Sequence, residues 1–138
     1  MMSTRLSRRA MLALAAILII AIGLTTRLPG IAWPPIVAKY LGSALWGAMV
    51  YCLVAFLRPQ WRMTSVALLA ACIAATIEAS QLWHPPWLDA FRETRLGVLL
   101  LGRFFAWADI AAYLVGISVA AVSDRSLSPA VDARRSEA

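Results

Sequence analysis

The sequence predicts an all-α integral membrane protein with four transmembrane helices and an interfacial helix or loop between the third and the fourth. Of its 138 residues, 62% are hydrophobic and only 14% are charged, whereas soluble domains usually carry about 25% charged residues. Its mean hydropathy is +0.75. Four apolar segments of roughly 17–22 residues are each long enough to cross a hydrocarbon core of about 30 Å as a helix. A soluble helical bundle is the alternative, but a 15.0 kDa globule cannot enclose so much apolar side chain.

The four spans follow one another within residues 10–122, between a basic cytoplasmic N-terminus and a disordered cytoplasmic tail. Their expected ranges are 10–26, 36–57, 63–83 and 104–122, with residues 1–9 before them and 123–138 after them. Lipid offers backbone polar groups no partner, so each span should be helical. The N-terminus also resembles a secretory signal, but its best cleavage position, at residues 21–23, lies inside the apolar run. A first transmembrane helix is therefore favoured.

The connection between the third and fourth spans, residues 84–103, is long for a membrane loop. Pro85 and Pro86 should end the third span, because proline disfavours a continuing helix. Trp87, Leu88 and Phe91 then fall on one side of a short helical pattern, with charged residues on the other side, which is typical of a helix lying at the interface. Residues 96–102 are apolar but too short to span the membrane. They either dip into the membrane edge or extend the fourth helix.

The charges lie between the apolar runs, which favours a role in membrane topology over nucleic-acid binding. The net charge is +6, from 13 Lys and Arg against 7 Asp and Glu. Because basic residues are enriched on the cytoplasmic side, the eight residues on the side of the termini favour cytoplasmic N- and C-termini over the five on the other side. The eight are Arg5, Arg8, Arg9, Arg58, Arg62, Arg125, Arg134 and Arg135, and the five are Arg27, Lys39, Arg92, Arg95 and Arg103.

Short motifs for catalysis or cofactor binding are not found in the sequence. Cys52 and Cys72 each lie inside an apolar run, where cysteine behaves as a small hydrophobe, so no disulfide is expected. No metal-ligand spacing, nucleophile elbow or phosphate-binding loop is present. We therefore expect no metal and no cofactor, and the sequence leaves open whether the protein is an enzyme.

Polar residues in the third and fourth spans fall at one depth. Glu78 precedes Trp83 by five residues and Asp109 follows Phe104 by five, so both carboxylates should lie roughly 7–8 Å below the outer interface. Carboxylates inside a membrane are costly and are usually paired around a wet cavity. The sequence therefore predicts one outward-facing polar pocket in which arginines pair with these carboxylates. Its predicted residues are Glu78, Gln81, Arg95, Arg103, Asp109, Arg27, Lys39 and Tyr113.

Several roles for this pocket stay open at this point. The residues can hold an anionic lipid or lipid-linked phosphate, because arginine forks match phosphate oxygens. They can serve only to join the helices through buried ion pairs. Two carboxylates can also act as general acid and general base if burial separates their pKa values. A transport path has less support, because the inner halves of the second, third and fourth spans as bounded above contain no charged residue.

Four sequence motifs extend over residues 23–116: "GLTTR", "KYLGSALWGAMVY", "EASQL" and "ETRLGVLLLGRFFAWADIAAYLVG". Together they resemble a family of small bacterial four-helix membrane proteins of unknown function, whose members often carry the label "ribosomal maturation YjgA family". This family typically has Gly-Asp before the second apolar run, where this chain has Gly42 and Ser43. The resemblance implies a multi-pass protein of the bacterial cytoplasmic membrane, and Ser43 argues against a metal held by three carboxylates.

The layout is also similar to that of VanZ-like proteins, which share an E-x-x-Q at a helix end, a following arginine and an aspartate on the next helix. By this likeness Glu78, Gln81, Arg95 and Asp109 are the corresponding positions. The likeness implies a cell-envelope role, either as an enzyme or through a lipid or glycan-lipid ligand. The expected partners are therefore membrane lipids, including anionic or polyprenyl-phosphate headgroups, and no nucleic acid. A homo-oligomer stays open.

Overall fold

The computed structural model describes residues 2–28, 30 and 32–127, with side chains described from Arg8 onward. This part of the chain forms six helices and no strand. The helices are α1 (Met2–Thr25), α2 (Pro35–Leu57), α3 (Met63–Ser80), α4 (Pro86–Glu93), α5 (Arg95–Leu101) and α6 (Trp107–Leu127). The predicted all-α class is confirmed, and the segment between the third and fourth spans contains two short helices.

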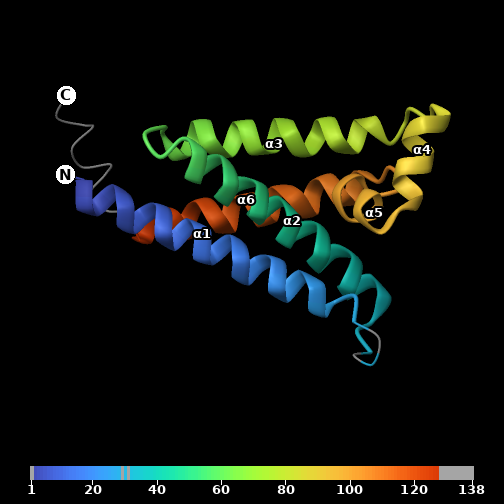
Figure 1. Cartoon of the computed structure of the whole chain (residues 1–138), viewed down its shortest axis with the longest axis horizontal. Helices are drawn as coiled ribbons and strands as arrows, with labels where there is room; N and C mark the ends of the chain where they lie inside the picture. The colour runs from blue at the N-terminus through green and yellow to red at the C-terminus, as the bar shows by residue number, and fades with distance from the viewer. Residues whose placement is uncertain (1, 29, 31, 128–138) are drawn as a thin grey trace.

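Four of these helices are long and apolar enough to cross a membrane. The qualifying windows are Arg8–Thr25, Pro35–Leu57, Met63–Ser80 and Trp107–Ser126. They run alternately up and down, so that α1 begins and α6 ends at one end of the molecule, while α4 and α5 lie at the opposite end (Figure 1). We call the first the terminal end and the second the loop end. This arrangement is compatible with a multi-pass membrane protein.

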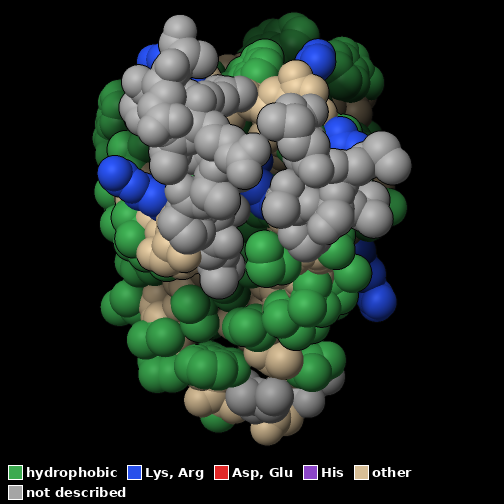
Figure 2. Space-filling view, turned by 90° about the vertical axis from the view of Figure 1, so that its left-hand side faces the viewer, with side chains coloured by type: hydrophobic (Ala, Val, Ile, Leu, Met, Phe, Trp, Pro, Cys, Tyr) green, Lys and Arg blue, Asp and Glu red, His purple; other side chains and the backbone are tan. Residues whose placement is uncertain are grey.

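The outer surface of the long helices is apolar. Ile17, Ile36, Leu68 and Val122, one from each long helix, are all more than 60% exposed. A soluble protein rarely leaves contiguous apolar surface of this extent uncovered, whereas lipid covers it without cost. In a view onto the terminal end, separate basic side chains lie in the upper half of the picture, and hydrophobic side chains fill much of the surface below them (Figure 2). The surface chemistry therefore matches that of a membrane-embedded helical bundle.

Helices α2 and α6 form the closest helix pair, because glycines let their backbones approach. A Cβ atom at Gly47 would lie 2.6 Å from the carbonyl oxygen of Tyr113. A Cβ atom at Gly116 would overlap the carbonyl oxygen of Ala44. Gly116 belongs to the small-residue stripe Ala108, Ala112, Gly116 and Ala120, whose spacing is typical of tight helix packing in membranes. The α2–α6 pair forms the centre of the bundle, against which α1 and α3 pack.

The helix boundaries differ from the expected ones in several places: α1 begins at Met2 rather than at residue 10, α3 ends at Ser80 rather than at residue 83, and α6 begins at Trp107 rather than at residue 104. Further differences lie at the end of the fourth span and at residues 96–102. Helix α6 continues to Leu127, so residues 123–127 are helical rather than part of a disordered tail, and residues 128–138 lie outside the described part. Residues 95–101 form α5, which ends at Gly102 with a φ of 66°. Only glycine adopts this conformation easily, and α5 is therefore separate from α6 rather than an extension of it.

A buried ion pair closes the terminal end. Arg8 of α1 donates from Nε to Oδ1 of Asp124 of α6 at 3.0 Å, and the Tyr51 hydroxyl of α2 donates to Oδ2 of Asp124 at 3.0 Å. Arg8 also donates to the carbonyl oxygen of Pro59 at 2.7 Å. Asp124 falls in the segment expected to be a tail, which is why the inner half of the fourth span was expected to carry no charge. The longer helix corrects that expectation.

Replacement of Gly116 by alanine should destabilise the bundle, because the added Cβ atom must displace the Ala44 carbonyl and push α2 away from α6. Overpacking of this kind typically costs about 1–3 kcal/mol. Gly42→Ala is the matched control, since a Cβ atom there meets nothing within 4 Å. Thermal unfolding in detergent should show a clear drop in Tm for Gly116→Ala and none for Gly42→Ala. Equal Tm values would contradict the proposed close contact.

Candidate functional site

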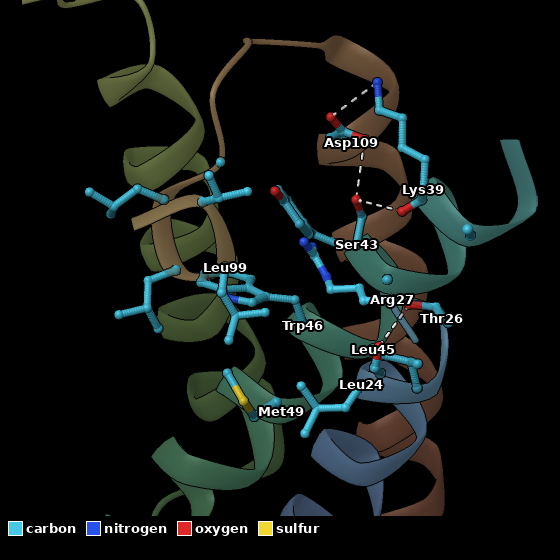
Figure 3. Close-up of a pocket in the computed structure, with 18 of the residues that line it drawn as sticks. Leu24, Thr26, Arg27, Lys39, Ser43, Leu45, Trp46, Met49, Leu99 and Asp109 are labelled. Atoms are coloured by element: carbon cyan, nitrogen blue, oxygen red, sulfur yellow. Dashed lines mark hydrogen bonds and ion pairs between the residues drawn. The ribbon is translucent and has the colours of Figure 1, made fainter. Parts of the chain in front are cut away.

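A cavity of about 610 Å³ lies at the loop end, between α1 and α2 on one side and α5 on the other, and reaches the start of α6. Much of its wall is apolar and comes from α1, α2 and α5, as with Leu24, Leu45, Met49 and Leu99. Figure 3 shows Trp46 reaching from α2 toward α5, where Leu99 faces it. We call this space the outer cavity, in line with the topology expected from the basic residues.

Three basic side chains stand around the outer cavity: Arg27 after the end of α1, Lys39 on α2 and Arg103 after α5. In Figure 3 the guanidinium of Arg27 points toward the space between α2 and α5. The Nζ atom of Lys39 lies 3.6 Å from Oδ2 of Asp109. Within the described residues, Arg27 and Arg103 form no ion pair with a carboxylate. Two of the three cations thus have no carboxylate partner in the part of the chain that the structure describes.

Asp109 is bound from α2 rather than by an arginine. Besides its contact with Lys39, its Oδ1 lies 3.2 Å from the Ser43 hydroxyl, which can donate to it (Figure 3). Asp109 is 7% exposed, while the Lys39 side chain is 52% exposed. Since solvent or headgroups screen an exposed partner, this ion pair should contribute little to stability. An aspartate in place of Ser43 would put a second carboxylate here, so serine makes the site less acidic.

Glu78 lies behind the wall of the outer cavity, and its side chain is fully buried. Its Oε1 accepts a hydrogen bond from the backbone N–H of Ala106 at 2.8 Å. Its Oε2 accepts from the Tyr113 hydroxyl at 3.0 Å and from the Gln81 amide at 3.2 Å. No arginine contacts Glu78 among the described residues, contrary to the expected arginine pairing. The carboxylate therefore joins α3, α6 and the connection before α6.

Two polar atoms near the cavity lack partners within the described chain. The Gln81 amide nitrogen donates to the carbonyl oxygen of Leu101 at 2.6 Å, but its Oε1 accepts no hydrogen bond. The indole N–H of Trp46 is also buried without an acceptor. Both residues line the outer cavity. Buried polar atoms are nearly always hydrogen-bonded, so these two are unusual, although both are covered by their neighbours in this structure.

Arg92 is an important polar residue that the sequence analysis assigned to the charged face of an interfacial helix. It is only 3% exposed, and its guanidinium donates to the carbonyl oxygens of Trp83 at 2.8 Å and Ser80 at 2.6 Å. It also contacts Asp89 at 3.2 Å. Carbonyls at a helix C-terminus have no partner within the helix, so Arg92 supplies donors to Ser80, the last residue of α3, and to Trp83 in the turn that follows. An arginine shortly after a helix end is the feature of the sequence from which this contact could have been predicted.

The eight predicted site residues fall into three groups. Six line the outer cavity: Gln81, Arg103, Asp109, Arg27, Lys39 and Tyr113. Glu78 contacts Tyr113 and Gln81 from behind the wall. Arg95 begins α5, is exposed and is not among the residues lining the cavity. Most of the predicted set thus lines one cavity, while the common membrane depth and ligand binding by these residues stay predictions.

Comparison with known proteins gives a family but no function. The family model described as "Protein of unknown function (DUF2809)" matches residues 32–117, which run from the start of α2 to the middle of α6. No solved structure matches the chain. The match supports the predicted membership of an uncharacterised family. It supports neither the ribosomal-maturation label nor the likeness to VanZ-like proteins.

Replacement of Glu78 by glutamine should destabilise the bundle although it preserves the shape of the side chain. All three contacts of Glu78 are donors, so the new amide must face one of them with a second donor. Leaving a buried donor unsatisfied costs about 1–3 kcal/mol. Thermal unfolding in detergent measures the loss, with the exposed Glu93→Gln as control. An unchanged Tm for Glu78→Gln would show that the carboxylate is not needed at this position.

Replacement of Arg92 by lysine should loosen α4 and α5 while keeping the charge. In the unmodified protein, one guanidinium nitrogen donates to the carbonyl of Trp83 and the other to the carbonyl of Ser80. The single ammonium group of lysine cannot replace both of these hydrogen bonds. Hydrogen exchange of residues 81–105 should become faster, while α2 stays protected. Arg95→Lys is the matched control, because Arg95 is exposed. Exchange that speeds up equally in both variants would contradict the assigned role of Arg92.

Proposed function

We propose that this chain, which belongs to the DUF2809 family of proteins of unknown function, binds an anionic lipid or a lipid-linked phosphate in the outer cavity. The observation that carries the proposal is the combination of an apolar wall with Arg27 and Arg103 at the cavity, neither of which has a carboxylate partner within the described residues. A lipid with a phosphate headgroup has the same division into an anionic head and an apolar tail. Arginine binds phosphate oxygens through two parallel hydrogen bonds.

The unpartnered atoms of the cavity favour the same class of ligand. The Trp46 indole N–H requires an acceptor, which a phosphate or sugar oxygen provides. The Gln81 Oε1 requires a donor, which a hydroxyl or a protonated phosphate oxygen provides. A purely hydrocarbon ligand would satisfy neither atom. Both atoms are covered in this structure, so a polar headgroup reaches them when the Trp46 and Gln81 side chains rotate toward the cavity.

The proposal includes the side of the membrane on which the cavity opens. The eight basic residues expected on the side of the termini favour a cytoplasmic terminal end. The loop end, with α4, α5 and the outer cavity, would then face the outer leaflet of a bacterial cytoplasmic membrane. A protein holding an anionic lipid there would act in the cell envelope. The buried position of Arg92 explains one of the basic residues that the charge rule disfavours on that side.

Two other roles receive weaker support. An acid–base enzyme of the VanZ-like kind needs two carboxylates at the reacting centre, but Glu78 does not line the cavity and its oxygens accept three hydrogen bonds. A purely structural role accounts for Glu78 and Arg92. It leaves the cations of the cavity without a purpose. We therefore favour binding at the cavity and stabilisation by Glu78 behind it.

The proposal predicts that purified protein retains an anionic phospholipid or polyprenyl phosphate and that Arg27→Ala and Arg103→Ala each weaken this retention. A charged hydrogen bond contributes about 1.5–3 kcal/mol, so each variant should bind roughly ten- to a hundredfold more weakly. Native mass spectrometry of protein titrated with phosphatidylglycerol or a polyprenyl phosphate measures the change.

Arg95→Ala is the matched control for this experiment, because Arg95 is exposed and does not line the cavity. It should bind as the unmodified protein does. A zwitterionic phospholipid should bind weakly to all four proteins. If the three variants and the unmodified protein retain anionic lipid equally, the cations do not form a headgroup site and the proposal is wrong.

A further inference from the structure

A second cavity of about 260 Å³ lies toward the terminal end, between α1, α2 and α6. We call it the inner cavity. Its wall includes Leu12 and Ala15 of α1, Cys52 of α2 and Val119 of α6, and it reaches the buried pair formed by Arg8 and Asp124. The family motifs and the polar residues of the outer cavity do not explain why space is left here.

The two cavities adjoin at two side chains. Ile19 of α1 and Leu45 of α2 line both of them and lie between the outer and the inner cavity, and we call this pair the neck. Both residues are apolar. Together the cavities follow α1 from Arg27 at one end to Arg8 at the other.

The chemistry of the inner cavity suits hydrocarbon rather than an ion or a polar solute. Its lining is mostly aliphatic, and its charged members already contact each other. Both oxygens of Asp124 accept hydrogen bonds from Arg8, and Oδ2 also accepts from Tyr51. A polar guest would therefore lose its hydration and find few free partners, which is costly in a low-dielectric site.

The length of this track selects the class of lipid. The apolar window of α1 from Arg8 to Thr25 has 18 residues, or about 27 Å at about 1.5 Å per residue. This is close to the full hydrocarbon core of about 30 Å, whereas the chains of an ordinary phospholipid cross only their own leaflet. We propose, on the basis of the lipid-binding function above, that the ligand is a long-chain polyprenyl phosphate whose single chain passes Ile19 and Leu45 and ends in the inner cavity.

Photo-crosslinking with the unmodified full chain in lipid vesicles tests this proposal. The probe is a long-chain polyprenyl phosphate with a photoreactive group at the end of the chain away from the phosphate. Peptide mapping should place its label on segments lining the inner cavity, around Leu12, Cys52 and Val119. A short-chain prenyl phosphate with the same group should label only segments of the outer cavity, such as residues 98–101.

Two tryptophan variants of α2 give matched controls. Leu45→Trp fills the neck and should abolish the inner label. Leu53→Trp adds the same side chain at a position that is 45% exposed and lines neither cavity, so it should leave the inner label unchanged. Unlabelled long-chain polyprenyl phosphate should compete strongly for the inner label, whereas phosphatidylglycerol, which can occupy only the headgroup site, should compete more weakly.

Different failures of this experiment have different meanings. If the long-chain probe is retained and labels only the outer cavity, the placement of the chain is wrong while the headgroup site stands. If phosphatidylglycerol competes as well as polyprenyl phosphate, the assignment of the lipid class is wrong. If no prenyl phosphate or anionic phospholipid is retained at all, both this inference and the proposed function are overturned.

Discussion

The carboxylate of Glu78 is buried inside α3, a helix long and apolar enough to cross a membrane, and its need for hydrogen-bond donors determines how the loop end is built. Its two oxygens draw donors from three places: the side chain of Gln81, the hydroxyl of Tyr113 on α6 and the backbone N–H of Ala106. Each contact fixes one part of the chain relative to α3. The position of α5 follows, since Gln81 also binds the carbonyl of Leu101. The wall of the outer cavity thus depends on this one acid.

The long helices and the gathering of most of the polar residues around one cavity could be predicted from the sequence, whereas the partners of these residues could not. Hydropathy and length define a membrane-compatible helix well, and counting residues along it places Glu78 and Asp109 near the same end of the bundle. Depth does not give the direction in which a side chain points around the helix. Arginine pairing was the obvious expectation, but Asp109 is bound by Lys39 and Ser43, and Glu78 by neutral donors. The backbone N–H of Ala106, which donates to Glu78, could not be predicted as a partner because every residue except proline has such a group.

The placements expected for two charged residues, Asp124 and Arg92, are wrong for a related physical reason. Asp124 was assigned to a tail because the apolar run stops before it, yet its helix continues since a buried partner on α1 compensates the charge. Arg92 was assigned to a polar face because α4 is amphipathic, yet the carbonyls at the end of α3 draw it inward. In both cases a contact with another helix or loop, 116 residues away for Asp124 and 9 and 12 residues away for Arg92, overrode the local pattern. Apolar periodicity alone therefore underestimates the extent of buried polar structure in a small membrane protein.

Helix α6 carries a buried acid near each of its ends, Asp109 and Asp124, separated by about 22 Å at about 1.5 Å per residue. The first is held from α2 and the second from α1 and α2. The contacts at both ends oppose sliding of α6 along its neighbours, the buried one with Arg8 more strongly than the exposed one with Lys39. In a bilayer of a different thickness the bundle would tilt as a unit, or the surrounding lipid would stretch or thin. A bundle held in this way would fit a narrow range of membrane thickness.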